Sequence, residues 1–273
     1  MPLPRCLVQA KQRVGRRCGP SKNEEKAWPN NSGLSPDARY GLGMHVLLVR
    51  HGRPETVVNS PTVADPGLTE LGHWQAERLA HWLANENIDH VITSPKRRAI
   101  ETVHGVFTPR GLTHQVVEDF NEIDLGSHTY HPTELLSTEG GEFWDKIMAG
   151  QFDEIGWDHP DVFNARVLAA WQNLCLNPPG DRVVVGCHGG TIRVILAAVA
   201  GNPGASFRVD YASISRIEVA ASNDEHPEPL CQIISTNETG HFDAQRSEPV
   251  GPMRDGGVVP PPRSRQPLSA PKN

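Results

Sequence analysis

The stretch Val46-Leu47-Leu48-Val49-Arg50-His51-Gly52 decides the fold of this chain. Four apolar residues lead directly into an arginine, a histidine and a glycine, and Pro54 follows shortly after. A short apolar run that ends at Gly and Pro predicts a fully buried strand with a loop at its carboxyl end. Ligands of open α/β sheets bind at such ends, so Arg50 and His51 stand where chemistry would be done. Gly52 would let the backbone or a ligand approach closely.

A second strand is predicted over 91–93, followed by a helix that runs to Phe107. Ser94 is the predicted N-cap of this helix, and Pro95 its first residue. The first helical turn carries Lys96, Arg97 and Arg98. Such a turn is either a solvated basic surface or an anion site, in which arginine and free backbone N–H groups act together. The position after a strand favours the anion site.

A third buried strand is predicted over 182–187, with His188-Gly189-Gly190 at its tip. Thr191 is the predicted cap of a helix over 192–200. Further helices are expected over 68–85 and 161–176, and further strands over 115–117, 213–219 and 230–234. Short helices are expected over 132–136 and 142–148. The alternation of strands and helices predicts an α/β fold, a three-layer sandwich with a mostly parallel central sheet and helices on both faces.

Composition separates the ends of the chain from its middle. Residues 1–43 show no helix or strand period and are expected to form a disordered N-terminal extension, and 243–273 a disordered Pro-rich tail. The domain between them, 44–242, carries 13 Lys/Arg and 26 Asp/Glu, a net charge of −13. An acidic domain argues against nucleic-acid binding, and no apolar run is long enough to span a membrane. The Arg-rich start resembles a transit peptide, but Glu24, Glu25 and the scarcity of serine count against targeting.

Five cysteines at irregular spacing predict neither a disulfide framework nor a zinc site, so a reducing, cytoplasmic location is expected.

Five ordered segments of residues 44–242 resemble the histidine phosphatase superfamily, also called phosphoglycerate mutase-like. The first is Leu48-Val49-Arg50-His51-Gly52, which resembles the family signature. Four more follow in the family's order: Leu68-Thr69-Glu70-Leu71-Gly72-His73-Trp74-Gln75-Ala76, Thr93-Ser94-Pro95-Lys96-Arg97-Arg98-Ala99-Ile100-Glu101-Thr102, Asn121-Glu122-Ile123-Asp124-Leu125-Gly126 and His188-Gly189-Gly190. Any one of these segments alone is a weak signal, whereas five in order are a strong one.

The resemblance implies that His51 is a nucleophile that forms a phosphohistidine. A neutral imidazole is nucleophilic near pH 7, and neighbouring arginines favour its neutral form. Arg50, Arg98 and His188 would hold the phosphoryl oxygens, because arginine offsets the negative charge of a phosphomonoester. Glu122 would protonate the leaving alkoxide and then activate water. Gly52, Gly189 and Asn59 are expected to contribute to substrate binding.

Some positions leave alternatives open. Glu118, Asp119 and Asp124 compete with Glu122 for the acid role. Where the family often has Arg-His-Gly-Glu/Gln-Thr-x-x-Asn, this chain has Arg53-Pro54-Glu55, and Val57 occupies the asparagine position. Asn59 would take that role after a shift of two residues. Other departures are Lys96, where the family has leucine, and the segment 126–130. These departures leave the phosphate core intact and the substrate open.

The sequence thus predicts a metal-independent phosphatase that hydrolyses phosphomonoesters and needs no cofactor. Its partner would be a phosphorylated small molecule, and the oligomeric state, monomer or homodimer, is left open. Two alternatives remain: a phosphoglycerate mutase-type phosphotransferase, and a non-catalytic sensor of phosphorylated ligands.

Overall fold

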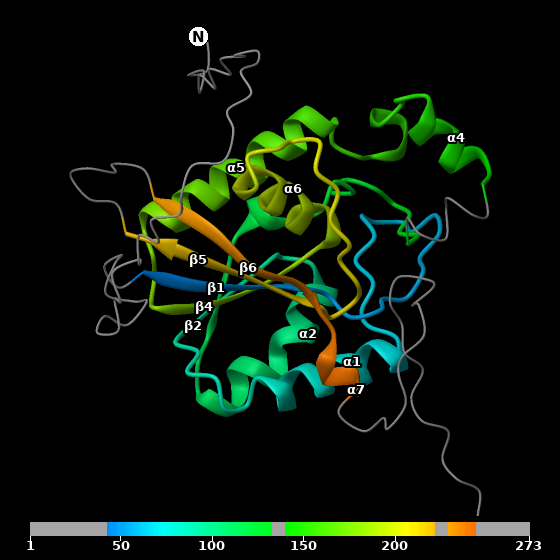
Figure 1. Cartoon of the computed structure of the whole chain (residues 1–273). Coiled ribbons are helices and arrows are strands. Elements are labelled where there is room, and N and C mark those ends of the chain that lie inside the picture. Colours follow the sequence, from blue (N-terminus) through cyan, green and yellow to red (C-terminus); the bar gives the residue numbers. More distant parts are fainter. Residues whose placement is uncertain (1–42, 133–139, 222–228, 244–273) are drawn as a thin grey trace, which may run out of the picture. The chain divides into compact units, whose positions relative to one another are not determined.

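Six strands form one sheet in the order β3-β2-β4-β1-β5-β6 (Figure 1). The computed structural model describes residues 43–132, 140–221 and 229–243. In chain order the strands are β1 (Met44–Arg50), β2 (His90–Thr93), β3 (His114–Val116), β4 (Arg182–Cys187), β5 (Ile214–Ala220) and β6 (Leu230–Glu238). Strands β1 to β4 pair in parallel, whereas β5 runs antiparallel to both β1 and β6. The predicted mostly parallel sheet is confirmed.

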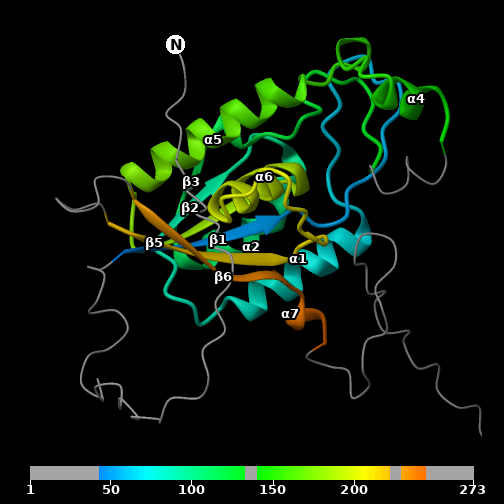
Figure 2. The same cartoon turned by 45° about the horizontal axis from the view of Figure 1, so that its top comes forward.

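Strand β1 lies between two hydrophobic cores. Val46 and Leu48 belong to one core, and Leu47 and Val49 to the other, because successive side chains of a strand point to opposite faces. Helices α5 (Pro160–Leu176) and α6 (Gly189–Val199) cover the first face, and α1 (Glu70–Trp82) and α2 (Arg97–Phe107) cover the second (Figures 1 and 2). The predicted three layers are therefore confirmed. Burying each such side chain contributes about 1.5–3 kcal/mol.

Short elements make the connections outside these layers. They are η2 (Thr108–Arg110), η3 (Glu118–Phe120), α4 (Glu142–Met148), η4 (Asp153–Ile155) and α7 (Gly240–Asp243). The helix expected over 142–148 is confirmed. The one expected over 132–136 falls almost wholly outside the described residues, as do the extension over 1–43 and the tail over 243–273. No helix of the described ranges has the length and hydropathy needed to cross a membrane.

Two predicted helix caps are wrong, for one physical reason. Helix α2 begins at Arg97 rather than Pro95; the Ser94 hydroxyl oxygen accepts from the Lys96 N–H at 3.3 Å, before the helix, and lies 2.7 Å from Nε2 of His188. Helix α6 begins at Gly189, so Thr191 lies inside it and donates its hydroxyl to the Asn121 carbonyl at 3.1 Å. In both cases the hydroxyl that was expected to cap a helix binds a distant segment, and Ser94 keeps a local contact besides.

Candidate active site

The carboxyl ends of β1, β2 and β4 meet at one edge of the sheet. Arg50 is in register with Cys187, and Thr93 with Gly186. His51 follows β1, Ser94 follows β2 and His188 follows β4, so their side chains are brought together. The ring centroids of His51 and His188 lie 5.2 Å apart, and the two side chains are 2% and 0% exposed. His51 and His188, which the sequence placed at the ends of two strands, therefore lie side by side.

The hydrogen bond made by His51 determines which ring nitrogen is nucleophilic. Its Nδ1 lies 2.8 Å from the Gly52 carbonyl oxygen. A carbonyl only accepts, so Nδ1 carries the proton and Nε2 keeps its lone pair. The pKa of His51 lies well below its usual value, first because of burial and then because of Arg98 and Arg50. His51 is therefore a neutral imidazole at pH 7.

Arg98 is fully buried, and two of its nitrogen atoms have no described hydrogen-bond acceptor. Its side chain is 0% exposed, its Nη2 lies 3.4 Å from both carboxylate oxygens of Asp124, and its guanidinium stacks 4.3 Å from the Tyr130 ring centroid. Among the described residues no group accepts a hydrogen bond from its Nε or Nη1. A buried donor without a partner costs about 1–3 kcal/mol, so these atoms are suited to bind an anion.

Arg50 and His188 lie beside His51 and Arg98, and the four side chains form one cluster at this edge of the sheet. Arg50 donates from Nη1 to the Val209 carbonyl at 2.7 Å, and its guanidinium lies 4.0 Å from the Tyr211 ring centroid. His188 contacts Ser94 through Nε2, while its buried Nδ1 has no hydrogen-bond partner in the described part of the chain. With the serine donating to Nε2, Nδ1–H is a second donor for an anion. Burial and the nearby Arg98 keep the pKa of His188 well below its usual value.

Glu122 lies against the start of α6, beside His188. Its Oε2 accepts from the Gly190 N–H at 2.8 Å, and its Oε1 from the Ile123 N–H at 3.0 Å. A Cβ at position 190 would lie 2.2 Å from Oε1, so a side chain there would displace the Glu122 carboxylate. Arg166 of α5 supports the segment by donating to the Glu122 carbonyl at 2.6 Å. Burial, followed by the charge of Asp124, raises the pKa of Glu122. A carboxyl of raised pKa is suited to proton transfer.

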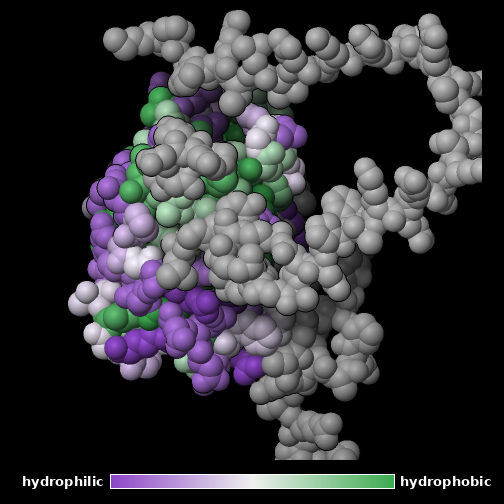
Figure 3. Space-filling model, turned by 60° about the vertical axis from the view of Figure 1, so that its left-hand side comes forward, coloured by the Kyte–Doolittle hydropathy of each residue, from purple (hydrophilic) through white to green (hydrophobic). Residues whose placement is uncertain are grey.

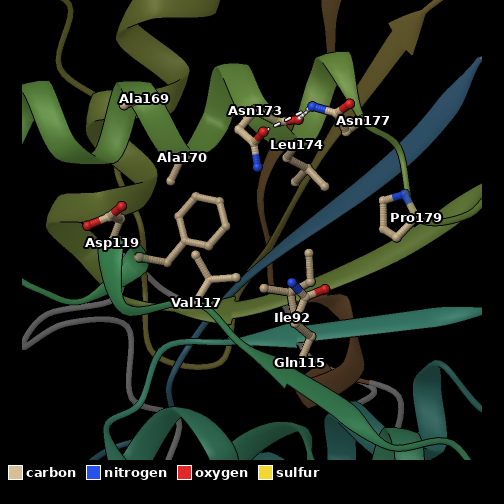
Figure 4. A pocket seen from close by; sticks show the side chains of 11 residues that line it. Ile92, Gln115, Val117, Asp119, Ala169, Ala170, Asn173, Leu174, Asn177 and Pro179 are labelled. Atoms are coloured by element: carbon tan, nitrogen blue, oxygen red, sulfur yellow. Dashed lines mark hydrogen bonds between the residues drawn. The ribbon is translucent and has the colours of Figure 1, made fainter.

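The four carboxylates that competed for the acid role are separated by the structure. Glu122 and Asp124 both lie near Arg98, and Asp124 pairs with it. Glu118 is exposed, and Asp119 lines a cavity between α5 and the strands β2 and β3 (Figure 4). Asp124 is engaged by Arg98, and Glu122 accepts from two backbone N–H groups. The choice of Glu122 as the acid stays a prediction.

The cavity in Figure 4 is not part of the cluster. Its volume is about 250 Å³, and none of the histidines and arginines of the cluster lines it. Apolar residues, among them Ile92, Val117 and Leu174, form its walls, together with the amides of Gln115, Asn173 and Asn177. Within the described residues, no three His, Cys, Asp or Glu side chains gather as candidate metal ligands.

The remaining predicted binding residues have different surroundings. The Gly52 N–H donates to Thr102 Oγ1 at 2.8 Å, and a Cβ at Gly52 would lie 2.8 Å from the Gly72 carbonyl, so this glycine allows close backbone packing. A Cβ at Gly189 would lie 3.2 Å from Arg50 Nε. Asn59 is exposed, and its described hydrogen bond runs from its backbone N–H to Thr129 Oγ1 at 3.1 Å. Its substrate-binding role stays a prediction.

The segment 68–76 holds the loop that follows His51. Thr69 caps α1 by accepting from the Gly72 N–H, and it donates its hydroxyl to the Arg53 carbonyl. Gln75 accepts from the Arg53 N–H at 2.8 Å. A side chain at Gly72 would collide with the Arg53 carbonyl, since a Cβ there would lie 2.1 Å from it. This motif therefore positions the loop, and no described contact joins it to the anion site.

Sequence reasoning missed three contributors to the cluster. Tyr130 and Tyr211 stack on the two arginines, and Ser94 binds His188. A single tyrosine in a loop carries no sequence signal. The only available cue was the place of Ser94 directly after a strand, which it shares with His51 and His188.

Comparisons with known proteins identify the family of this chain. The family model of the histidine phosphatase superfamily (branch 1) matches residues 46–226. A probable phosphoglycerate mutase, GpmB, of Yersinia pestis is 28% identical over 189 residues, which cover 66% of this chain and 86% of that protein. The same figures hold for the GpmB protein of Yersinia pseudotuberculosis.

Solved structures share the fold. YhfR of Bacillus stearothermophilus matches with a TM-score of 0.57 at 21% identity, over 73% of this chain and 99% of that one. The mycobacterial glucosyl-3-phosphoglycerate phosphatase matches with a TM-score of 0.53 at 20% identity, over 72% of this chain and 100% of that one. At such identities the likeness establishes the fold alone.

Proposed function

Because the chain belongs to the histidine phosphatase superfamily, we propose that it hydrolyses phosphomonoesters through a phosphohistidine on His51. One observation carries the proposal. The bond from His51 Nδ1 to the Gly52 carbonyl leaves the Nε2 lone pair free, beside the buried donors of Arg98 and His188. A nucleophile and a binding site for its anionic target thus share one edge of the sheet.

In the first step the Nε2 lone pair of His51 attacks phosphorus, and the P–O bond to the leaving alkoxide breaks. Arg50, Arg98 and His188 hold the phosphoryl oxygens, and Glu122 gives its proton to the alkoxide. The neutral imidazole of His51 thereby becomes a phosphohistidine. In the second step Glu122 takes a proton from water, the water oxygen attacks phosphorus, and the P–N bond returns its electron pair to His51. The products are inorganic phosphate and an alcohol.

The arginines supply the positive charge that a magnesium ion supplies in many other phosphoryl-transfer sites. Both guanidinium groups are buried, and a buried charge acts more strongly on a bound anion than an exposed one. We therefore expect hydrolysis to continue in a chelating buffer. Loss of activity in chelator, with recovery on adding Mg²⁺ or Zn²⁺, would contradict this part of the proposal.

A second candidate is transfer of the phosphoryl group to a phosphoglycerate. The names of the Yersinia relatives favour it. The two activities share the first step and differ only in what takes the phosphoryl group from His51. A mutase must keep water away from the phosphohistidine, whereas a phosphatase must admit it.

The experiment is a competition between the two acceptors. The protein is given a phosphomonoester in the presence and absence of 3-phosphoglycerate, and inorganic phosphate and bisphosphoglycerate are both quantified. We expect one phosphate released per substrate consumed, whether or not phosphoglycerate is present. Bisphosphoglycerate as the main product would establish the mutase instead. Binding of phosphate without turnover of any phosphomonoester would establish a non-catalytic sensor.

A further inference from the structure

Two cysteines lie side by side outside the phosphate site. Cys175 is near the end of α5 and Cys231 is near the start of β6, 56 residues later in the chain, and their Sγ atoms are 3.9 Å apart. Cys187 is the other free cysteine of the described residues, and it lies buried beside His188. The pair thus brings together α5 and β6, two elements that are far apart along the chain.

The pair lies near the surface. Cys175 is 9% exposed and Cys231 is half-buried, and the sequence neighbours Leu176 and Leu230 are both largely exposed. On the side of the molecule shown in Figure 3, hydrophobic and hydrophilic residues are mixed in the upper half, and hydrophilic ones predominate below. A small oxidant can therefore reach Cys231, while Cys175 packs against the core between α5 and the sheet.

The two thiols differ in their readiness to ionise. The hydrogen bond between them lowers the pKa of Cys231 and raises the pKa of Cys175, and burial raises the latter further. The thiolate is the reactive form of cysteine. Because Cys231 is also the more exposed of the two, we expect it to react first.

We propose that Cys175 and Cys231 form a peroxide-reactive thiol pair, in which Cys231 is oxidised first and Cys175 resolves it. The Cys231 sulfur attacks one oxygen of hydrogen peroxide, giving a sulfenic acid and releasing water. The Cys175 sulfur then attacks the Cys231 sulfur, the S–O bond breaks, and a second water leaves with the thiol proton. Overall two thiols and one peroxide give one disulfide and two waters.

The second step requires the two sulfur atoms to approach from 3.9 Å to the roughly 2.0 Å of a disulfide bond. The product would cross-link α5 to β6 over a long loop, which disfavours the unfolded chain. Neither sulfur has a described contact with His51, His188 or the arginines, so the inference is independent of the proposed function.

The test treats the reduced full-length protein with one equivalent of hydrogen peroxide. Peptide mapping is expected to find a Cys175–Cys231 disulfide, and the midpoint of thermal unfolding to rise by about 5–10 °C. Dithiothreitol should reverse both changes. Phosphatase activity should stay within about twofold, since the pair and the site are separate.

Three variants make the assignment specific. In Cys175→Ser we expect a lasting sulfenic acid on Cys231 that dimedone traps. In Cys231→Ser we expect no sulfenic acid on Cys175 and no rise in unfolding temperature. The matched control, Cys6→Ser with Cys18→Ser, keeps the pair and should behave like the unmodified chain. Oxidation confined to Cys6 or Cys18, or peroxide consumption unchanged in both single variants, would overturn the proposal.

Discussion

The two halves of the active site are built in different ways. His51, Ser94 and His188 each follow a strand of the parallel sheet, and backbone hydrogen bonds fix their register. The opposite half consists of loops over 53–67 and 124–130, which meet through single bridges such as Val57 with Tyr130. Under the proposed function, the sheet half supplies the nucleophile His51 and the phosphate ligand His188. The loop half is where the chain departs from its family. We therefore expect the sheet half to determine the reaction and the loop half to determine which substrate is chosen.

The largest expected effect comes from the nucleophile in the sheet half. His51→Ala should lower turnover by about 10⁴-fold or more, because no other described side chain in the cluster presents a free nucleophilic nitrogen fixed in the same way. The fold should survive, as judged by circular dichroism and thermal unfolding. His73→Ala is the matched control, since His73 is an exposed histidine of α1. Hydrolysis by His51→Ala at near the control's rate would contradict the assignment.

Glu122→Gln should have the next largest effect, and it depends on the leaving group. An alkyl phosphate releases a basic alkoxide, so its hydrolysis should fall about 10²–10⁴-fold. p-Nitrophenyl phosphate releases a weakly basic phenolate and should lose much less. Equal losses with both substrates would mean that Glu122 does not donate the proton. Glu118→Gln, at an exposed carboxylate, is the control.

The pH profile of kcat/KM tests the same two residues. Burial and arginines lower the pKa of His51, so the nucleophile should remain active well below pH 6.5. Burial raises the pKa of Glu122, so its acid form persists above the pH at which an exposed glutamate ionises. Activity should therefore be highest on the acid side of neutrality and decline as Glu122 loses its proton. In Glu122→Gln that alkaline decline should disappear. Its persistence would assign the decline to another group.

Arg98→Lys should lower kcat/KM by about 10²–10³-fold, because lysine lacks the paired Nε and Nη1 donors that point at the anion site. Asp124→Asn should cost less, about tenfold, since Asp124 pairs with Arg98 and raises the pKa of Glu122 but, we expect, does not itself touch the substrate. Steady-state kinetics with one phosphomonoester measures both. A larger loss in Asp124→Asn than in Arg98→Lys would instead make Asp124 the acid.

The smallest effects are expected in the loop half and at Lys96, which contacts it. Asn59→Ala and Lys96→Leu should change kcat less than about fivefold for the best substrate, while altering KM values across a panel of phosphomonoesters. Lys96 is buried and donates to the Ala64 carbonyl, so it ties the 53–67 loop to the start of α2. If either variant lost activity as fully as His51→Ala, the division between the two halves would fail.

The sequence predicted the sheet half well because its signals are local. The apolar runs of β1 and β4 mark buried strands, and Arg-His-Gly and His-Gly-Gly mark their tips. It misplaced Ser94 and Thr191, because a hydroxyl before a helix looks like a cap whether or not a distant partner takes it. It missed Tyr130 and Tyr211, whose role arises only from tertiary stacking on the arginines. It also ended β6 too early: Ser235 to Glu238 are polar, yet they continue the strand.

The central claim is that the phosphoryl group passes through Nε2 of His51. Rapid mixing with a phosphomonoester, quenching in base and mass spectrometry of the peptides tests it most directly. We predict a phosphoryl group on the peptide with His51, attached at Nε2, formed within the first turnover and lost at the steady-state rate. The same experiment on His51→Ala should give no adduct. Turnover without any adduct, or an adduct on His188 or another residue, would contradict the account.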